Sequence, residues 1–271
     1  MEGKRPRRRL LSQPCVILLK SIAMKDHSEV EEVDCYDPST NTYLRIPNEK
    51  AQSMLLSQIN TGAITSGLST LEQTGAYFDD EERSLILADD LDSIQFAENK
   101  DFDKHRERQL ATTTNATRKM LAIRVKALDR ETTSSEADIS DNWFGTAVDK
   151  VNLKSQFEAC SYGSLKVEPT NTGQDSVKGV YTVSIDMNVG GAEIGKVEQA
   201  VVRKLGEDLG NLNDLYDNVM ICVPPGTVEG IIAYAYINNW LSVYNNEWCN
   251  SVSAQMHGKF LNLWLQPFLI P

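Results

Sequence analysis

Short apolar runs separated by polar turns fill the first hundred residues of the chain. Runs of about four to eight residues with this character are typical of strands. On this basis we predict strands at residues 15–22, 33–36, 43–46, 84–88 and 94–96, and a helix at residues 49–59. The sequence therefore predicts a β-rich N-terminal domain over residues 1–98.

This pattern stops between residues 99 and 118. The stretch is charged and rich in threonine, and it holds almost no apolar residue. Such a composition cannot bury enough apolar surface to offset the conformational entropy that is lost on folding. We therefore predict a linker over residues 99–118.

A different pattern begins at residue 119. Residues 120–126 alternate, with Leu121, Ile123 and Val125 on one face of a strand. Further strands are predicted at residues 165–167, 180–187, 219–223 and 231–237, and helices at residues 140–160, 196–209 and from 252 onward. Strands that alternate with helices favour an α/β layer. The chain is therefore assigned to the α/β (α+β) class, with a second domain over residues 119–271.

Composition limits the classes of partner. The 271 residues are 41% hydrophobic and 7% aromatic, which is enough for an ordinary globular core. The net charge of -11 argues against a nucleic-acid-binding protein, because phosphate contacts require an excess of Lys and Arg. No apolar run is long enough to span a bilayer. We therefore expect no nucleic acid and no membrane span.

A basic cluster lies near the N-terminus and consists of Lys4, Arg5, Arg7, Arg8 and Arg9. A solvated tail explains it most simply, and a nuclear address or the charged start of a signal peptide are the alternatives. The apolar run that follows is broken by polar residues, so no signal peptide is predicted. The protein is then either cytosolic or begins elsewhere than at Met1.

Five cysteines lie far apart in the sequence, without a Cys-x-x-Cys pair. This spacing argues against a zinc ribbon and against a thioredoxin-like redox motif. In a cytosolic protein the cysteines would be buried thiols, whereas in an exported protein the odd number leaves one of them unpaired.

The spacing of a phosphate-binding loop occurs at Gly190-Gly191-Ala192-Glu193-Ile194-Gly195-Lys196. This segment falls between a predicted strand and a predicted helix, which is the context that such a loop requires. However, Val197 stands where a Ser or Thr hydroxyl should hold magnesium, and Glu193 would place negative charge against a phosphate. Nucleotide binding is therefore a remote alternative, and a strand-to-helix turn explains the segment better.

Several short motifs of the second domain follow one another in a fixed order. They are Cys160-Ser161-Tyr162-Gly163, Cys222-Val223-Pro224-Pro225-Gly226-Thr227, Ala233-Tyr234-Ala235-Tyr236-Ile237, Trp240-Leu241-Ser242-Val243-Tyr244, Trp248-Cys249 and Gln255-Met256-His257. In order and spacing, the region from Leu121 to His257 resembles the gametolysin family of zinc metallopeptidases, in its algal and diatom form. The resemblance covers about half of the chain.

The resemblance implies a metzincin-like fold whose upper subdomain is a twisted sheet with flanking helices. It also implies zinc as the cofactor, an extracellular location, and proteolysis of matrix or cell-wall proteins and glycoproteins. Residues 1–98 would then be a propeptide-like domain, with its junction in the linker. The peptidase domain would be incomplete, because the chain stops at Pro271 before the lower subdomain of a metzincin. An exposed apolar tail at residues 260–270 would then lower solubility.

The zinc-binding helix of this family carries His-Glu-x-x-His-x-x-Gly-x-x-His, in which three histidines hold the metal and the glutamate is the general base. The metal lowers the pKa of its water to about 7, and the glutamate takes the proton as this water attacks the peptide carbonyl. Here the first position is His257, but the glutamate position is Gly258 and the later histidine positions are Leu261 and Pro267. One ligand is kept, and the base is missing.

Other histidines are few, because the whole sequence contains only His27, His105 and His257. The first two belong to the propeptide-like domain and to the linker, so we do not expect them to replace the missing ligands. We therefore predict a gametolysin-type homologue that is inactive and does not bind zinc. A non-catalytic binding or decoy relative of the family is the alternative.

Two disulfides are also expected. Cys15 and Cys35 lie in neighbouring predicted strands, and a bond between Cys222 and Cys249 would tie a strand to the entrance of the zinc helix. Each bond requires Cα atoms about 4.4–6.8 Å apart.

Overall fold

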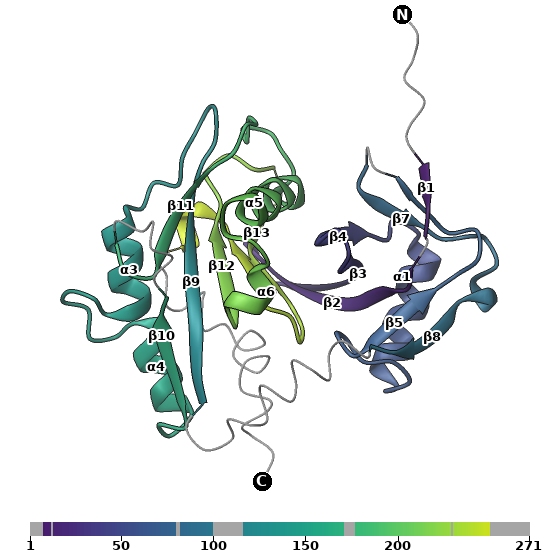
Figure 1. Ribbon diagram of the computed structural model, residues 1–271, viewed down its shortest axis with the longest axis horizontal. Coiled ribbons are helices and arrows are strands. Elements are labelled where there is room, and N and C mark those ends of the chain that lie inside the picture. The colour runs from purple at the N-terminus through teal and green to yellow at the C-terminus, as the bar shows by residue number, and fades with distance from the viewer. Residues whose placement is uncertain are drawn as a thin grey trace, which may run out of the picture. The chain divides into compact units, whose positions relative to one another are not determined.

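The computed structural model describes residues 8–11, 13–79, 82–99, 116–170, 177–228 and 230–249. The chain mixes helices and strands, which confirms the predicted α+β class (Figure 1). It forms two compact units, each assembled from separate stretches of sequence. The first unit contains Met1–Lys20, Glu31–Arg106 and Ile237–Asn239, and the second contains Ser21–Val30, Glu107–Tyr236 and Trp240–Pro271. No helix in the described part of the chain is long and apolar enough to cross a membrane.

Strands dominate the first unit. They are β1 (Arg8–Leu10), β2 (Cys15–Met24), β3 (Glu29–Asp37), β4 (Thr42–Arg45), β5 (Ser69–Glu72), β6 (Tyr77–Asp79), β7 (Ser84–Ile86) and β8 (Gln95–Glu98). The sheet order is β1-β6-β7-β4-β3-β2, and β5 lies between β2 and β8. β4 and β7 pair in parallel, whereas β3–β4, β6–β7 and β5–β8 pair antiparallel. The tip of the β2–β3 hairpin, residues 21–30, belongs to the second unit.

A helix, α1 (Glu49–Asn60), and a short 3-10 turn, η1 (Leu91–Ser93), complete the first unit. α1 starts after Asn48, whose side chain accepts hydrogen bonds from the amides of Lys50 and Ala51. This cap satisfies amides that the first helical turn leaves without helical partners. Further along, the side chain of Gln52 both accepts from the amide and donates to the carbonyl oxygen of Val33. These bonds fix α1 against β3.

A disulfide joins Cys15 of β2 to Cys35 of β3, with their Cα atoms 5.7 Å apart, which confirms the predicted pair. Both cysteines are buried in the core of the first unit, together with apolar residues such as Leu44, Leu71 and Leu85.

The second unit is a mixed sheet with helices. Its elements are β9 (Ala116–Lys126), α3 (Glu136–Phe144), α4 (Leu153–Cys160), β10 (Leu165–Pro169), β11 (Val180–Ser184), α5 (Ile194–Leu209), α6 (Leu212–Leu215), β12 (Asn218–Cys222), β13 (Ile231–Tyr236), β14 (Leu241–Tyr244) and η2 (Asn246–Trp248). The strand order is β13-β14-β12-β9, and β10 and β11 both pair with the remaining edge of β9. All neighbours run parallel except β13, which is antiparallel to β14.

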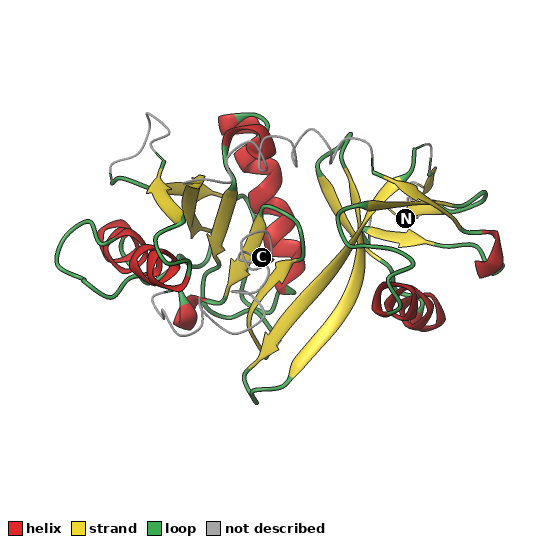
Figure 2. Ribbon diagram, turned by 90° about the horizontal axis from the view of Figure 1, so that it is seen from below, coloured by secondary structure: helices red, strands yellow, loops and turns green. Residues whose placement is uncertain are grey.

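Helices cover both faces of this sheet (Figure 2). On one face, α3 and α4 pack over a core that includes Met120, Ala122 and Ala233. On the other face, the hydroxyl of Tyr181 on β11 donates to Asp208 of α5. Because successive strand residues point to opposite faces, a strand covered on both sides reads as an apolar run. This explains why β12 and β13 are buried along their whole length.

The single helix predicted over residues 140–160 is wrong, because the structure divides this range into α3 and α4. Gly145 ends α3 with a φ of 65°, in the left-handed region that favours glycine. The carboxylate of Asp141 then accepts hydrogen bonds from the amides of residues 147–149 and holds them as a loop. α4 begins after Asn152, whose side chain accepts from the amide of Ser155.

Candidate functional site

The predicted zinc-site positions lie outside the described residues. This applies to His257 and to the positions occupied by Gly258, Leu261 and Pro267. Of the other two histidines, His105 is also outside, and His27 is exposed in the turn of the β2–β3 hairpin. Within the described ranges, no group of three or more His, Cys, Asp or Glu residues is placed to hold a metal ion. The geometry of the site must therefore be built from the residues that lead to His257.

The residues that lead to His257 run along one edge of the second unit's sheet. β12 and β14 are parallel, so their carboxyl ends meet at the same edge, where open α/β sheets commonly bind ligands. The amide of Val223 donates to the carbonyl oxygen of Tyr244 at 3.0 Å, and the amide of Asn245 donates to that of Ile232 at 2.9 Å. The chain is thus held by backbone hydrogen bonds immediately after β14.

A disulfide fixes the same edge. Cys222, the last residue of β12, is bonded to Cys249, which follows η2, and their Cα atoms are 5.6 Å apart. Both side chains are fully buried. The second predicted disulfide is therefore confirmed. Cys160 is the fifth cysteine, and it is the free one among the five, all of which the structure describes.

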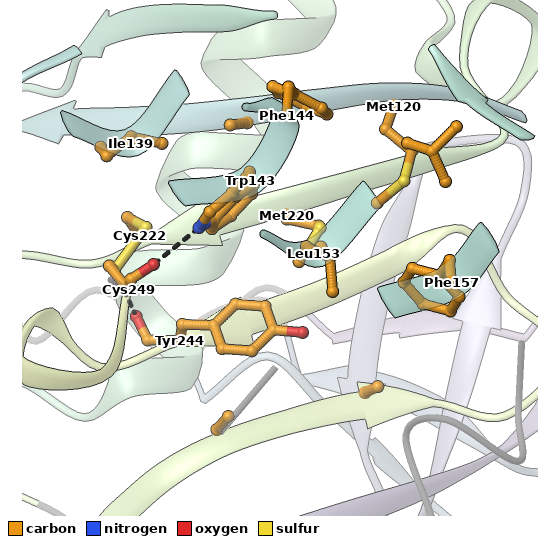
Figure 3. Packing of buried hydrophobic residues seen from close by; sticks show 14 of the residues in the cluster. Met120, Ile139, Trp143, Phe144, Leu153, Phe157, Met220, Cys222, Tyr244 and Cys249 are labelled. Carbon is orange, nitrogen blue, oxygen red and sulfur yellow. Dashed lines mark hydrogen bonds between the residues drawn. A yellow bond between two sulfur atoms is a disulfide. The ribbon is translucent and has the colours of Figure 1, made fainter. Parts of the chain in front are cut away.

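Trp143 of α3 supplies a third anchor (Figure 3). Its indole Nε1 donates to the carbonyl oxygen of Cys249 at 2.7 Å, and its ring meets that of Tyr244 edge-on at 5.9 Å. A buried indole N–H needs such a partner, because water cannot replace it. Burial raises the pKa of Tyr244 to about 12, so this phenol stays neutral.

The loop between β9 and α3 is attached to this edge by side-chain hydrogen bonds. The hydroxyl of Thr132 donates to the carbonyl oxygen of Cys222 at 2.6 Å and accepts from the amide of Val125 at 3.2 Å. The amide of Thr133 donates to Oδ1 of Asn246 at 2.8 Å. These polar groups hold loops in place. The edge is therefore held by side-chain hydrogen bonds and a disulfide as far as Cys249, where the described residues end.

In the glycine-rich turn considered for nucleotide binding, backbone amides bind a carboxylate of the chain itself. The amides of Val189 and Gly190 donate to the carboxylate of Asp129 at 2.9 and 3.0 Å. The amide of Val189 is the main reason why the pKa of Asp129 is lowered, with a further contribution from that of Gly190. The ammonium group of Lys196 lies 3.6 Å from the carboxylate of Glu193. A phosphate would have to displace an internal carboxylate, so the geometry does not favour nucleotide binding.

A buried glutamate bonded to two tyrosines was not predicted from the sequence. Glu198 of α5 is only 1% exposed, and its Oε2 accepts hydrogen bonds from the hydroxyls of Tyr234 and Tyr236 on β13. A signal was present, because Glu198 lies four residues after Ile194 and three before Val201, on the apolar face of the helix. The two tyrosines are two residues apart on a strand, so they share a face.

Comparison with protein-family models, with curated proteins and with solved structures finds no match to this chain. Any assignment to a family therefore depends on the sequence resemblance alone.

Proposed function

We propose that this chain is a gametolysin-type zinc metallopeptidase homologue that does not hydrolyse peptides. One observation carries the proposal. The ordered motif series reaches His257, but Gly258 stands at the position of the general base and Leu261 and Pro267 at the positions of the second and third ligands.

The donor set at these positions does not fit a hydrolytic zinc ion. Glycine and leucine side chains offer no lone pair, and a proline has no amide hydrogen and no ligating side-chain atom. A complete set of ligands supplies about 10–16 kcal/mol of zinc-binding free energy, which a single imidazole cannot approach. The position that the general base occupies in this family carries Gly258, which has no group to take a proton from an attacking water.

The arrangement of the second unit supports the assignment to this family. Its motifs fall at the ends of elements or within them, since Cys160 ends α4, Cys222 ends β12, and the two aromatic motifs lie in β13 and β14. A sheet with helices on both faces is what the resemblance leads us to expect of an upper subdomain. The buried disulfide at Cys249 supports an oxidising, extracellular location, where such bonds persist.

A binding or decoy role on matrix or cell-wall glycoproteins is the second candidate. The observation that favours it is that the chain leading toward His257 is firmly held as far as Cys249, by the disulfide to Cys222 and by the hydrogen bond from Trp143. A protein that has lost its chemistry but keeps the surrounding structure is suited to binding without cleavage.

Zinc content and proteolysis test the proposal together. The full chain is produced in an oxidising compartment, dialysed against excess zinc and then against metal-free buffer, and analysed for metal per chain. We expect far less than one zinc ion per chain and no cleavage of protein substrates, with or without a chelator. His257→Ala is the matched variant and should have the same low zinc content. Stoichiometric zinc that is lost in His257→Ala, together with chelator-sensitive cleavage, would refute the proposal.

A further inference from the structure

Residues of the two units are interleaved in the sequence. The hairpin tip, residues 21–30, belongs to the second unit although the residues on both sides of it belong to the first. Conversely, the turn between β13 and β14, residues 237–239, belongs to the first unit. In a domain that one cut in a linker releases, all residues on one side of the cut belong to one unit. Here they do not.

The hairpin tip is an integral part of the second unit. Ala23 is 3% exposed and lies in the core that also contains Met120 and Trp143. The amide of Lys25 donates to the carbonyl oxygen of Gly230 at 2.8 Å, just before β13. The tip therefore contributes both a buried side chain and a backbone hydrogen bond. By comparison, the ion pair of Lys25 with Glu247 is exposed and contributes little.

The β13–β14 turn is an equally integral part of the first unit. The amide of Ile237 donates to the carbonyl oxygen of Leu19 at 2.8 Å. The hydroxyl of Ser66 donates to the carbonyl oxygen of Ile237 and accepts from the amide of Leu19, each at 2.8 Å. The side-chain amide of Asn238 donates to the carbonyl oxygen of Ser66 at 3.0 Å. One hydroxyl thus serves two backbone groups that would otherwise be buried without partners.

We infer that residues 1–98 are a permanent, strand-exchanging partner of the rest of the chain and are not released when residues 99–118 are cut. Removal of the N-terminal fragment would take Ala23 out of a packed core and expose the unpaired backbone of a strand. Both disulfides join cysteines on the same side of such a cut, so the association would be non-covalent. The inference does not depend on the proposed lack of hydrolysis.

A cut in the full chain tests this inference. Residues 104–110 are replaced by the recognition sequence of a site-specific protease, and an affinity tag is added at the N-terminus. After complete cleavage, size-exclusion chromatography with light scattering should show one species with the mass of one uncut chain. The affinity resin should retain both fragments without reductant. Two separate peaks, or loss of the C-terminal fragment from the resin, would overturn the inference.

Ser66→Ala in the cut protein tests whether the contacts of the β13–β14 turn hold the two fragments together. The variant leaves two backbone groups without their partner and should raise the dissociation constant of the two fragments by about tenfold. Thermal unfolding before the cut establishes that the variant is folded. Thr61→Ala is the control, since the hydroxyl of Thr61 bonds only to carbonyl oxygens of its own helix among the hydrogen bonds of the described residues. Equal dissociation constants for the two variants would contradict the exchange.

Discussion

At the scale of single residues, the buried carboxylate of Glu198 is the group whose burial must be compensated most fully. A charged or polar side chain in the interior is tolerated only when hydrogen bonds replace those it made with water. Tyr234 and Tyr236 both donate to the same oxygen, and Tyr234 makes the shorter bond. The three side chains thereby connect α5 to β13.

Tyr234→Phe removes the shorter of these two hydrogen bonds and keeps the ring in place. We expect a loss of about 1–3 kcal/mol in the free energy of unfolding, because the buried oxygen of Glu198 is left with only the longer bond from Tyr236. Tyr236→Phe is the matched control and should cost less, since its hydroxyl lies 3.3 Å from the same oxygen. Urea unfolding followed by circular dichroism measures both. An unchanged free energy of unfolding in Tyr234→Phe would show that this bond does not contribute to stability.

Asp141 gives a prediction with a defined pH dependence. Hydrogen bonds from the amides of Ala147, Val148 and Asp149 lower the pKa of its carboxyl group, with Ala147 contributing most and partial desolvation opposing the shift. The stabilisation is therefore fully present above the unfolded-state pKa of about 3.9, and it is lost as the pH falls through the lower pKa of the folded protein.

Asp141→Asn should lower the denaturation midpoint at pH 7, and the difference from the parent should shrink as the pH falls below about 4. Glu168→Gln, at an exposed position on β10, is the control and should change little at any pH. Denaturant titrations between about pH 7 and pH 2 measure the two differences. A deficit of Asp141→Asn that is constant over this range would contradict the assigned role of the carboxylate.

At the scale of elements, apolar runs predicted most strands, and two of the missed strands share a physical reason. β5 and β6 are short and only partly buried, so their sequences do not alternate clearly enough to be distinguished from turns. β14 was quoted only as part of a motif, although all four of its residues are buried. The zinc-helix positions lie beyond the described residues, so their arrangement stays a prediction.

The division between α3 and α4 depends on one glycine. Gly145→Ala places a side chain at a φ of 65° and brings its Cβ onto the side-chain amide of Asn152. We expect a loss of about 2–4 kcal/mol, from backbone strain and from displacement of the residue that caps α4. Gly163→Ala is the control, because its φ is 79° but nothing lies within 4 Å of the added Cβ. Its cost should therefore be about 1–2 kcal/mol. If thermal unfolding shows equal losses of stability for Gly145→Ala and Gly163→Ala, the contact with Asn152 does not contribute to the loss.

At the scale of the whole molecule, segments far apart in the sequence are joined in two ways. Each unit contains one disulfide, and each unit includes a segment whose sequence neighbours belong to the other unit. The Cys15–Cys35 bond was predictable because neighbouring strands bring cysteines within bonding distance, whereas the Cys222–Cys249 bond was expected from the position of Cys249 at the entrance of the predicted zinc helix. The interleaving was not predictable, because the hairpin tip and the β13–β14 turn look like ordinary turns in the sequence. Only the three-dimensional structure assigns them to their units.

Because the two units exchange segments, we expect them to unfold cooperatively. The three tryptophans that the structure describes, Trp143, Trp240 and Trp248, lie in the second unit, so tryptophan fluorescence reports chiefly on the unfolding of this unit. Cys222→Ala with Cys249→Ala should lower this transition by about 2–4 kcal/mol, as expected for a bond that closes a loop of this length. Because the units exchange segments, Cys15→Ala with Cys35→Ala should lower the same transition, although these cysteines belong to the first unit. Cys160→Ser is the control. A fluorescence transition unmoved by loss of the Cys15–Cys35 bond would mean that the units unfold independently.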